Sequence, residues 1–372
     1  MKTSIHIVAL FFLITATGFA QEGEAVDFAR QILPILSDKC FVCHGPDAKD
    51  EDLVRLDSFA GATTDLGDYF AIDHLHPEKS ELVNRIDSVD DPMPPIEFDK
   101  KLTDQERTLL RRWVSAGGEY SKHWAFVPPV KAKGVEIAAD GNPIDYWVGS
   151  QLRKKGIDFA PPASQAILAR RAALVLTGLP PEPRLLKALL ADKSEQAYAR
   201  FVDELLSDPR FGEHQARYWL DAVRYGDTHG LHLDNRRGIY PYRDWVVKAF
   251  NENLPFDDFI TWQLAGDLLP EPTLAQRVAT GFVRMNPTTG EGGAIPLEFQ
   301  AKNNFDRVET FGTVFLGMSL NCARCHTHKY DPIKQQEYYQ LLAFFNSTAE
   351  PSMDRNAYEY GTVARAPEDQ DA

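Results

Sequence analysis

The sequence predicts a mainly α-helical protein with a small N-terminal domain and a larger C-terminal domain. Apolar residues recur at three- and four-residue spacing through most of the chain, and no stretch shows the convincing alternation of a β-strand. Helix-start signals support this fold class, such as Thr103 followed by Glu106 and Asn142 followed by Pro143. The third observation is a Cys-x-x-Cys-His motif that occurs once in each predicted domain.

The composition bounds the domain count and the class of partner. The chain has 372 residues, 44% of them hydrophobic, and a formal net charge of −14. The length suits two or three domains, and the composition is ordinary for a globular protein. No nucleic-acid partner is expected, because nucleic-acid binding depends on basic contacts to phosphate. A basic redox protein would suit the charge, but an acidic surface also serves solubility alone, so the partner is unknown.

Residues 1–20 predict a secretory signal peptide. Lys2 supplies the positive start, an apolar run follows, and Gly18 and Ala20 are the small residues that precede a cleavage site, so the mature chain would begin at Gln21. The apolar run is too short for an uncleaved membrane anchor, which needs about 20 residues. We expect an exported protein, periplasmic or at the cell surface, with no transmembrane segment after signal cleavage.

All four cysteines of the chain belong to two copies of one motif. The copies are Cys40-Phe41-Val42-Cys43-His44 and Cys322-Ala323-Arg324-Cys325-His326. At this spacing two thiols can bond covalently to the vinyl groups of a haem, and the next residue presents an imidazole to the iron. The pattern therefore predicts two covalent haem c groups, with His44 and His326 as iron ligands.

Other roles for the cysteines explain less of this pattern. A Cys₄ zinc site spaces its two cysteine pairs by roughly 15–20 residues, not by most of a chain. A thioredoxin-like motif belongs near a βαβ pattern, which we do not find in the sequence. Two short-range disulfides are possible in an oxidising compartment. None of these alternatives accounts for a histidine after each second cysteine.

The first domain is expected at residues 22–120. Residues 25–36 have helical spacing and lead into Cys40, with Pro34 dividing them into two helical pieces. A loop-rich stretch and a short helix around residues 82–86 follow. Thr103 then caps a helix that Gly117 ends.

Met93 is the predicted second axial ligand of the first haem. It lies in Asp91-Pro92-Met93-Pro94-Pro95, where prolines preset φ and remove amide donors, so the thioether can be held at one point. A core methionine is the alternative. His74 and His76 are rival ligands, placed by the sequence in a polar loop. Two helices, a haem motif and a Met ligand together make a small class-I-like cytochrome c domain.

Residues 121–141 are predicted to be a linker, since they are rich in Pro and Gly. Residues 142–350 are predicted to form a larger helical domain that carries the second motif, followed by an acidic tail at 351–372. Apolar stripes at helical spacing mark its helices. After the helix that begins at Asn142, they lie at residues 168–176, 198–206, 218–223, 245–250, 256–264, 305–315 and 338–345.

The distal ligand of the second haem is left open. The candidates are His229, His232, Met285, Met318 and His328. His328 is too near His326 to reach the opposite face of the ring easily, and Met318 falls on an apolar stripe. His229 and His232 would share a face on a helix. With Asp227 and Asp234 they could instead bind a metal such as zinc, and a hydrogen-bonded polar loop explains them at least as well.

Several longer stretches carry a resemblance. In the first half they are Pro34-Ile35-Leu36, Cys-Phe-x-Cys-His-Gly, Arg55-Leu56-Asp57, Met93-Pro94-Pro95 and a Leu-Arg-Arg-Trp helix. On these, residues 27–118 resemble the planctomycete-type cytochrome c domain. Later stretches are Leu176-Thr177-Gly178-Leu179-Pro180-Pro181, Trp219-Leu220-Asp221, Thr228-His229-Gly230-Leu231-His232-Leu233-Asp234-Asn235, Tyr242-Arg243-Asp244-Trp245, Leu264-Ala265-Gly266-Asp267 and Lys329-Tyr330-Asp331-Pro332. On these, residues 142–347 resemble the uncharacterised domain that usually follows it in exported planctomycete proteins.

The resemblance implies an exported haem protein and brings no established activity for the second domain. Relatives commonly continue into a further C-terminal domain, whereas this chain is expected to stop in its acidic tail.

The favoured function is electron transfer by a dihaem c-type cytochrome. A thioether ligand raises the potential of the first haem, which would exchange electrons with a second haem of different ligation. The alternative is a haem enzyme of the dihaem-peroxidase type, in which Arg224, Arg284 or Glu291 would line the second haem. A polysaccharide- or surface-binding module with a redox haem is a third reading. Catalytic residues are unknown at this point, and a carrier is favoured over an enzyme.

Overall fold

A computed structural model of the chain describes residues 25–48, 53–131, 142–348 and 351–354. The predicted signal peptide, residues 132–141 of the predicted linker and most of the acidic tail lie outside these ranges. The described residues are mainly helical, and their only extended pairings are three isolated β-bridges, so the predicted helical class is confirmed. The chain divides into two compact units, Met1–Pro128 and Pro129–Ala372.

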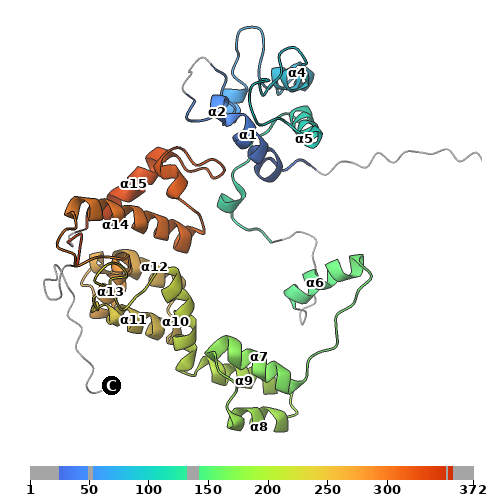
Figure 1. The fold of residues 1–372 in the computed structure, drawn as a ribbon. Helices are drawn as coiled ribbons and strands as arrows, with labels where there is room; N and C mark the ends of the chain where they lie inside the picture. The colour runs from blue at the N-terminus through green and yellow to red at the C-terminus, as the bar shows by residue number, and fades with distance from the viewer. Residues whose placement is uncertain (1–24, 49–52, 132–141, 349–350, 355–372) are drawn as a thin grey trace, which may run out of the picture. The chain divides into compact units, whose positions relative to one another are not determined.

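The first unit is built from short helices joined by long loops (Figure 1). Pro34 stands in the first turn of α1, directly after a π-helical segment, so the break expected at this proline is present. The helices are η1 (Phe28–Ile32), α1 (Leu33–Lys39), α2 (Phe41–His44), α3 (Phe59–Ala62), η2 (Pro77–Lys79), α4 (Glu81–Asp87), α5 (Asp104–Ser115) and η3 (Trp124–Phe126).

Helix α5 begins with the capping box that the sequence predicts. Thr103 Oγ1 accepts the N–H of Glu106 at 3.3 Å, and the Glu106 carboxylate accepts the N–H of Thr103 at 2.7 Å. Glu106 also pairs with Lys39 of α1 at 3.1 Å. The cap therefore fixes where α5 starts and links it to the helix that leads into Cys40.

The second unit is a succession of helices. They are α6 (Pro143–Lys154), α7 (Gln165–Thr177), α8 (Pro183–Ala191), α9 (Ala197–Leu206), α10 (Arg210–Ala222), α11 (Tyr240–Asn251), α12 (Phe256–Ala265), η4 (Gly266–Leu268), α13 (Leu274–Ala279), η5 (Thr280–Arg284), α14 (Pro296–Phe311), η6 (Gly312–Leu316), η7 (Asn321–Arg324) and α15 (Gln335–Asn346). Asn142 caps α6 by accepting the N–H of Ile144, and Gly178 ends α7 in a left-handed conformation that suits glycine.

Among the residues of the second unit that the structure describes, three hydrophobic cores hold the helices together. One lies among α7, α8 and α9, and another among α10, α11, α12 and η5. The third joins α14, η7 and α15 around buried Val308, Leu320, Ala323 and Tyr338. Because Ala323 lies between the two cysteines of the second motif, that motif is built on the edge of the third core.

The described helices can also be compared with the length and apolar character of a membrane span. Among the described residues, no helix combines the length and the apolar character that crossing a bilayer requires.

Candidate functional site

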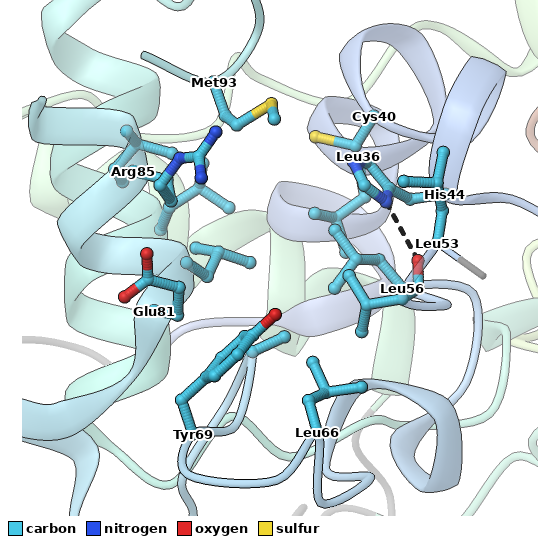
Figure 2. A pocket seen from close by; sticks show the side chains of 15 residues that line it. Leu36, Cys40, His44, Leu53, Leu56, Leu66, Tyr69, Glu81, Arg85 and Met93 are labelled. Carbon is cyan, nitrogen blue, oxygen red and sulfur yellow. Dashed lines mark hydrogen bonds between the residues drawn. The ribbon is translucent and has the colours of Figure 1, made fainter. Parts of the chain in front are cut away.

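The residues predicted to surround the first haem meet at one cavity of about 220 Å³ in the first unit. Cys40, His44 and Met93 all line it. Figure 2 shows Cys40 and His44 on one wall, Met93 and Arg85 on the facing wall. The remaining lining is largely apolar: Leu36, Leu53, Val54, Leu56, Leu66, Tyr69, Ala71, Glu81, Leu82, Ile86 and Leu110.

A second cavity of about 240 Å³ adjoins the first. The two share four lining residues, Cys40, His44, Leu53 and Met93. The second cavity adds the other thiol of the motif, Cys43, together with the prolines that follow Met93 and the ring of Phe98. Both thiols and the methionine therefore border one continuous region of mostly apolar lining.

His44 is held in a way that suits iron binding. Its Nδ1 lies 2.9 Å from the carbonyl oxygen of Val54. That contact requires the proton on Nδ1, so Nε2 carries a free lone pair. The N–H of Leu56 donates to the carbonyl of His44 at 2.8 Å, which fixes the backbone from the same segment. A histidine that binds a metal almost always donates its other ring N–H to such an acceptor.

Gly45 follows the histidine because no side chain fits there. An added Cβ would lie 2.3 Å from the carbonyl oxygen of Phe41, far inside van der Waals contact with an atom of the backbone. The glycine lets the chain leave α2 close beside the motif.

The two thiols of the first motif differ in environment. Cys40 is half-buried and Cys43 is exposed, and all four cysteines of the chain are free. Burial raises the pKa of the Cys40 thiol to about 12. Before any reaction with a haem, Cys40 is therefore protonated at neutral pH.

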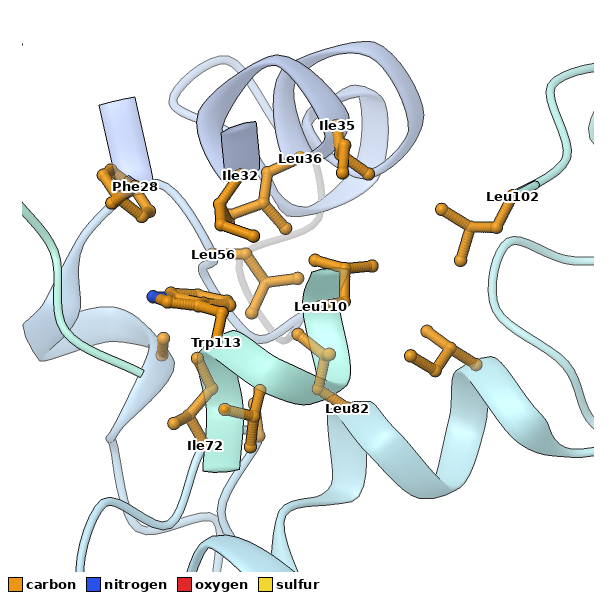
Figure 3. Close-up of a cluster of buried hydrophobic side chains, with 14 residues drawn as sticks. Phe28, Ile32, Ile35, Leu36, Leu56, Ile72, Leu82, Leu102, Leu110 and Trp113 are labelled. Atoms are coloured by element: carbon orange, nitrogen blue, oxygen red, sulfur yellow. The ribbon is translucent and has the colours of Figure 1, made fainter. Parts of the chain in front are cut away.

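The core of the first unit sets the position of the motif (Figure 3). Ile32 and Leu36, on the helical turns before Cys40, pack with Leu110 and Trp113 of α5. Leu82 of α4 joins the same core. The helix that ends just before Cys40 and the helix that precedes Met93 are thus placed by one set of buried contacts.

The two rival ligands lie elsewhere. The ring of His74 meets Phe59 edge-on at 5.7 Å, and His76 is exposed beside Glu78. Among the described residues, neither lines either of the two cavities. The donor set at the cavities, two thiols, an imidazole with a free Nε2 and a thioether, fits a covalently attached haem.

The second motif presents its groups at the surface. Cys322, Cys325 and His326 are exposed, around the short helix η7. The Arg324 guanidinium lies over the ring of Phe305 at 3.6 Å, and its backbone carbonyl accepts the hydroxyl of Tyr339 at 3.0 Å. The motif is therefore anchored through Arg324, and its two thiols and its imidazole are exposed to solvent.

His326 repeats the arrangement of His44. Its Nδ1 lies 2.7 Å from the carbonyl oxygen of Thr327, which again leaves Nε2 free. Beneath the motif, the Tyr338 hydroxyl and Glu309 Oε2 are buried without a hydrogen-bond partner. Burial raises the pKa of Tyr338 to about 12. Unpaired buried polar atoms are costly, and Tyr338 belongs to the core that supports the motif.

The candidates for the second distal ligand have different surroundings. Met285 is buried among α11, α12 and η5, and Met318 packs against the core that contains Ala323. His328 is bonded locally, since its Nδ1 accepts the N–H of Asp331 at 2.8 Å. None of these three side chains is held toward solvent.

His229 and His232 lie in a loop and not on a helix, which agrees with the polar-loop alternative. Three residues of the loop, Gly230, Leu233 and Asp234, have positive φ, which no helix permits. His229 is buried, with no partner for Nδ1, whereas the His232 side chain is 70% exposed, 3.6 Å from Glu291. Over the ranges that the structure describes, no three His, Cys, Asp or Glu residues gather as a metal site.

The two arginines considered for an enzymatic second site are bound to acidic partners. Arg224 pairs with Asp306, and Arg284 with Asp354. Arg237, which the sequence analysis did not single out, pairs with the same Asp354 at 2.7 Å in a buried contact. These arginines join segments distant in the chain.

A further cavity of about 420 Å³ in the second unit is lined mainly by aromatic rings, among them Phe211, Trp219, Phe256 and Phe259. It contains none of the residues predicted for either haem.

Comparison with protein families gives two matches. Residues 40–97 match the family described as Planctomycete cytochrome C, a range that runs from the first cysteine to just beyond Met93. Residues 143–350 match the family described as protein of unknown function (DUF1549), and this range contains the second motif. No curated protein and no solved structure matches significantly.

Proposed function

The chain belongs to the DUF1549 family of unknown function, with a planctomycete cytochrome c domain before that region, and on this premise we propose that it is an exported dihaem c-type cytochrome that transfers electrons. The observation that carries the proposal is the meeting of Cys40, His44 and Met93 at one cavity. These three residues are far apart in sequence or differ in chemistry, and haem attachment gives all of them a role.

Each group of the first site has a part in holding the haem. The thiols of Cys40 and Cys43 would form the thioether bonds, His44 would offer Nε2 to the iron, and Met93 would offer its sulfur. The bound haem supplies one-electron chemistry. The mostly apolar lining would limit the access of water to the iron, and a thioether ligand in such a surrounding would favour the reduced state.

The second haem is proposed at Cys322, Cys325 and His326. The support is the free Nε2 of His326 and the exposure of both thiols. The unpaired atoms of Tyr338 and Glu309 beneath the motif also indicate a place where a further group is expected. His229 or His232 remains the predicted distal ligand of the second haem.

Export is proposed from residues 1–20, which read as a signal peptide. A periplasmic or cell-surface location agrees with haem c, whose attachment takes place outside the cytoplasm. The electron donor and acceptor are redox proteins of unknown identity.

A redox titration followed by absorption spectroscopy tests the electron-transfer function. The matured chain should show low-spin haems that take up and release electrons reversibly. Met93→Leu should keep its covalent haem, lose the low-spin signature of the first site and lower its midpoint potential. Met353→Leu changes another buried methionine by nearly the same volume and should leave the potential unchanged. A matured chain whose haems cannot be reduced and reoxidised would refute the proposal.

The exposed second motif favours one alternative, a haem enzyme of the dihaem-peroxidase type. An iron with an open position at His326 would be high-spin and would react with hydrogen peroxide. Two low-spin haems that do not react with hydrogen peroxide would exclude this alternative.

A further inference from the structure

We propose that Arg85 is a positioning residue that holds Met93 at the first haem site. The inference rests on the proposed function, because it requires Met93 to be the iron ligand. Arg85 lies in α4, just before the loop that carries the methionine, and it lines the same cavity.

Arg85 makes three bonds to this loop. Its backbone carbonyl accepts the N–H of Met93 at 2.9 Å. Its Nε donates to the carbonyl of Asp91 at 3.0 Å, and its terminal nitrogen pairs with the Asp91 carboxylate at 2.8 Å. One residue therefore binds both the ligand residue and the residue two positions before it.

The loop has few other means of holding its shape. Residues 91–95 read Asp-Pro-Met-Pro-Pro, and proline has no N–H, so only Asp91 and Met93 carry amide donors. The Asp91 N–H donates to Ser88 Oγ at 3.0 Å, and the Met93 N–H to Arg85. Beyond the methionine, Lys101 Nζ donates to the carbonyl of Pro95 at 2.7 Å. Met93 thus lies between two anchored ends.

Helix α4 is a rigid support for Arg85. Leu82 and Ile86 of this helix are buried in the core of the first unit. Their packing fixes the helix and hence the carbonyl and Cα of Arg85. A displacement of Met93 would have to break bonds to an element that the core holds in place.

The three bonds are expected to contribute unequally to fixing the position of Met93. The Asp91 side chain is 72% exposed, so its ion pair is screened by solvent and contributes little. The bond from Nε to the Asp91 carbonyl fixes the backbone directly and comes from a charged donor, which makes it the stronger of the two side-chain bonds. Asp91→Asn should therefore be mild and Arg85→Met severe.

The test uses the full chain matured with haem. Two readouts report on the bond between Met93 and ferric iron: the weak red absorption band of methionine ligation, and the rate at which cyanide displaces the methionine. In Arg85→Met, haem content should stay normal, the band should weaken, and cyanide should bind about tenfold faster, as expected from losing one charged hydrogen bond. Arg85→Lys keeps the positive charge but not the Nε geometry, and should behave like Arg85→Met.

Arg111→Met is the matched control. Arg111 also pairs with a residue of α4, Asp87, but makes no bond to the loop at 91–95 in the contacts described. It should leave the band and the cyanide rate as in the parent. A wild-type band and cyanide rate in both Arg85 variants would overturn the inference. If instead Met93→Leu keeps the band, Met93 is not the iron ligand. Both the assignment of Met93 under the proposed function and the positioning role of Arg85 then fail.

Discussion

Cys40 and Cys43 belong to one motif, yet their thiols should react differently before haem attachment. Burial holds the Cys40 thiol protonated and raises its pKa to about 12. The thiolate is the reactive form, and Cys43 is exposed. In haem-free protein at neutral pH, iodoacetamide should label Cys43 well before Cys40, as followed by peptide mass spectrometry.

The exposed Cys322 and Cys325 serve as internal references in the same experiment. They should be labelled on the time scale of Cys43. Equal labelling of Cys40 and Cys43 would contradict the burial described for the first site.

For single residues, the sequence predicted which side chains would bind haem but not the residues that hold those side chains in place. Cys40, Cys43, His44 and Met93 follow from motif spacing and flanking prolines. The acceptor for His44 Nδ1 is a backbone carbonyl, that of Val54, and every residue carries one. Arg85 is equally hidden, because its role depends on how the chain turns after α4 to bring residues 91–93 back to the end of that helix. Residue type gives no signal for either contact.

Among the elements, α5 offers a clear test because its cap links two helices. Thr103→Ala removes the side-chain acceptor for the Glu106 N–H and should cost about 1 kcal/mol of local stability. Thr108→Ala is the control, since its hydroxyl only bonds back to the Asp104 carbonyl within the helix. Hydrogen exchange of α5 amides measures the difference, because it reports local opening. Equal exchange in the two variants would contradict the role of the cap.

The sequence predicted elements well where local chemistry decides them. The break at Pro34 and the capping box at Thr103 are both present, because each depends on neighbours within a few residues. At His229 and His232 the sequence left a helix face and a polar loop both open, since a three-residue spacing fits either, and the structure has the loop. Helix α8 (Pro183–Ala191) was not predicted, because its short apolar pattern follows a run of prolines.

For the whole molecule, the two compact units imply that the first can act by itself. The residues that border its cavities all precede the boundary at Pro128. A fragment of residues 22–128, exported by a signal peptide in a host that matures haem c, should attach one haem. Its spectrum should equal that of the full chain with Cys322→Ala and Cys325→Ala, in which only the first site can form thioethers.

A fragment that stays haem-free, while the double variant of the full chain carries its haem, would show that the first unit depends on the second. The predicted boundaries at residues 120 and 142 would then need revision, because a domain is expected to hold its own core and site.

The division of the chain was the part of the architecture most open to sequence reasoning. Pro and Gly at residues 128–141 signal a connection between two helical regions. Most of the longer helices of the second unit also follow from apolar spacing, whereas α8 and α13 do not. The three cores of this unit do not follow from it either, because they depend on which stripes meet, as Trp219 meets Phe259 and Phe315 across long separations.

Intact-mass spectrometry of the matured chain and two double variants measures covalent haem most directly. The parent should carry the mass of two haems, and the variants Cys40→Ala/Cys43→Ala and Cys322→Ala/Cys325→Ala one each. If the parent, exported by a host that attaches haem to other c-type cytochromes, has only the mass of its amino acids and no Soret absorption, then thioether-bound haem is absent and the assignment of both motifs is wrong.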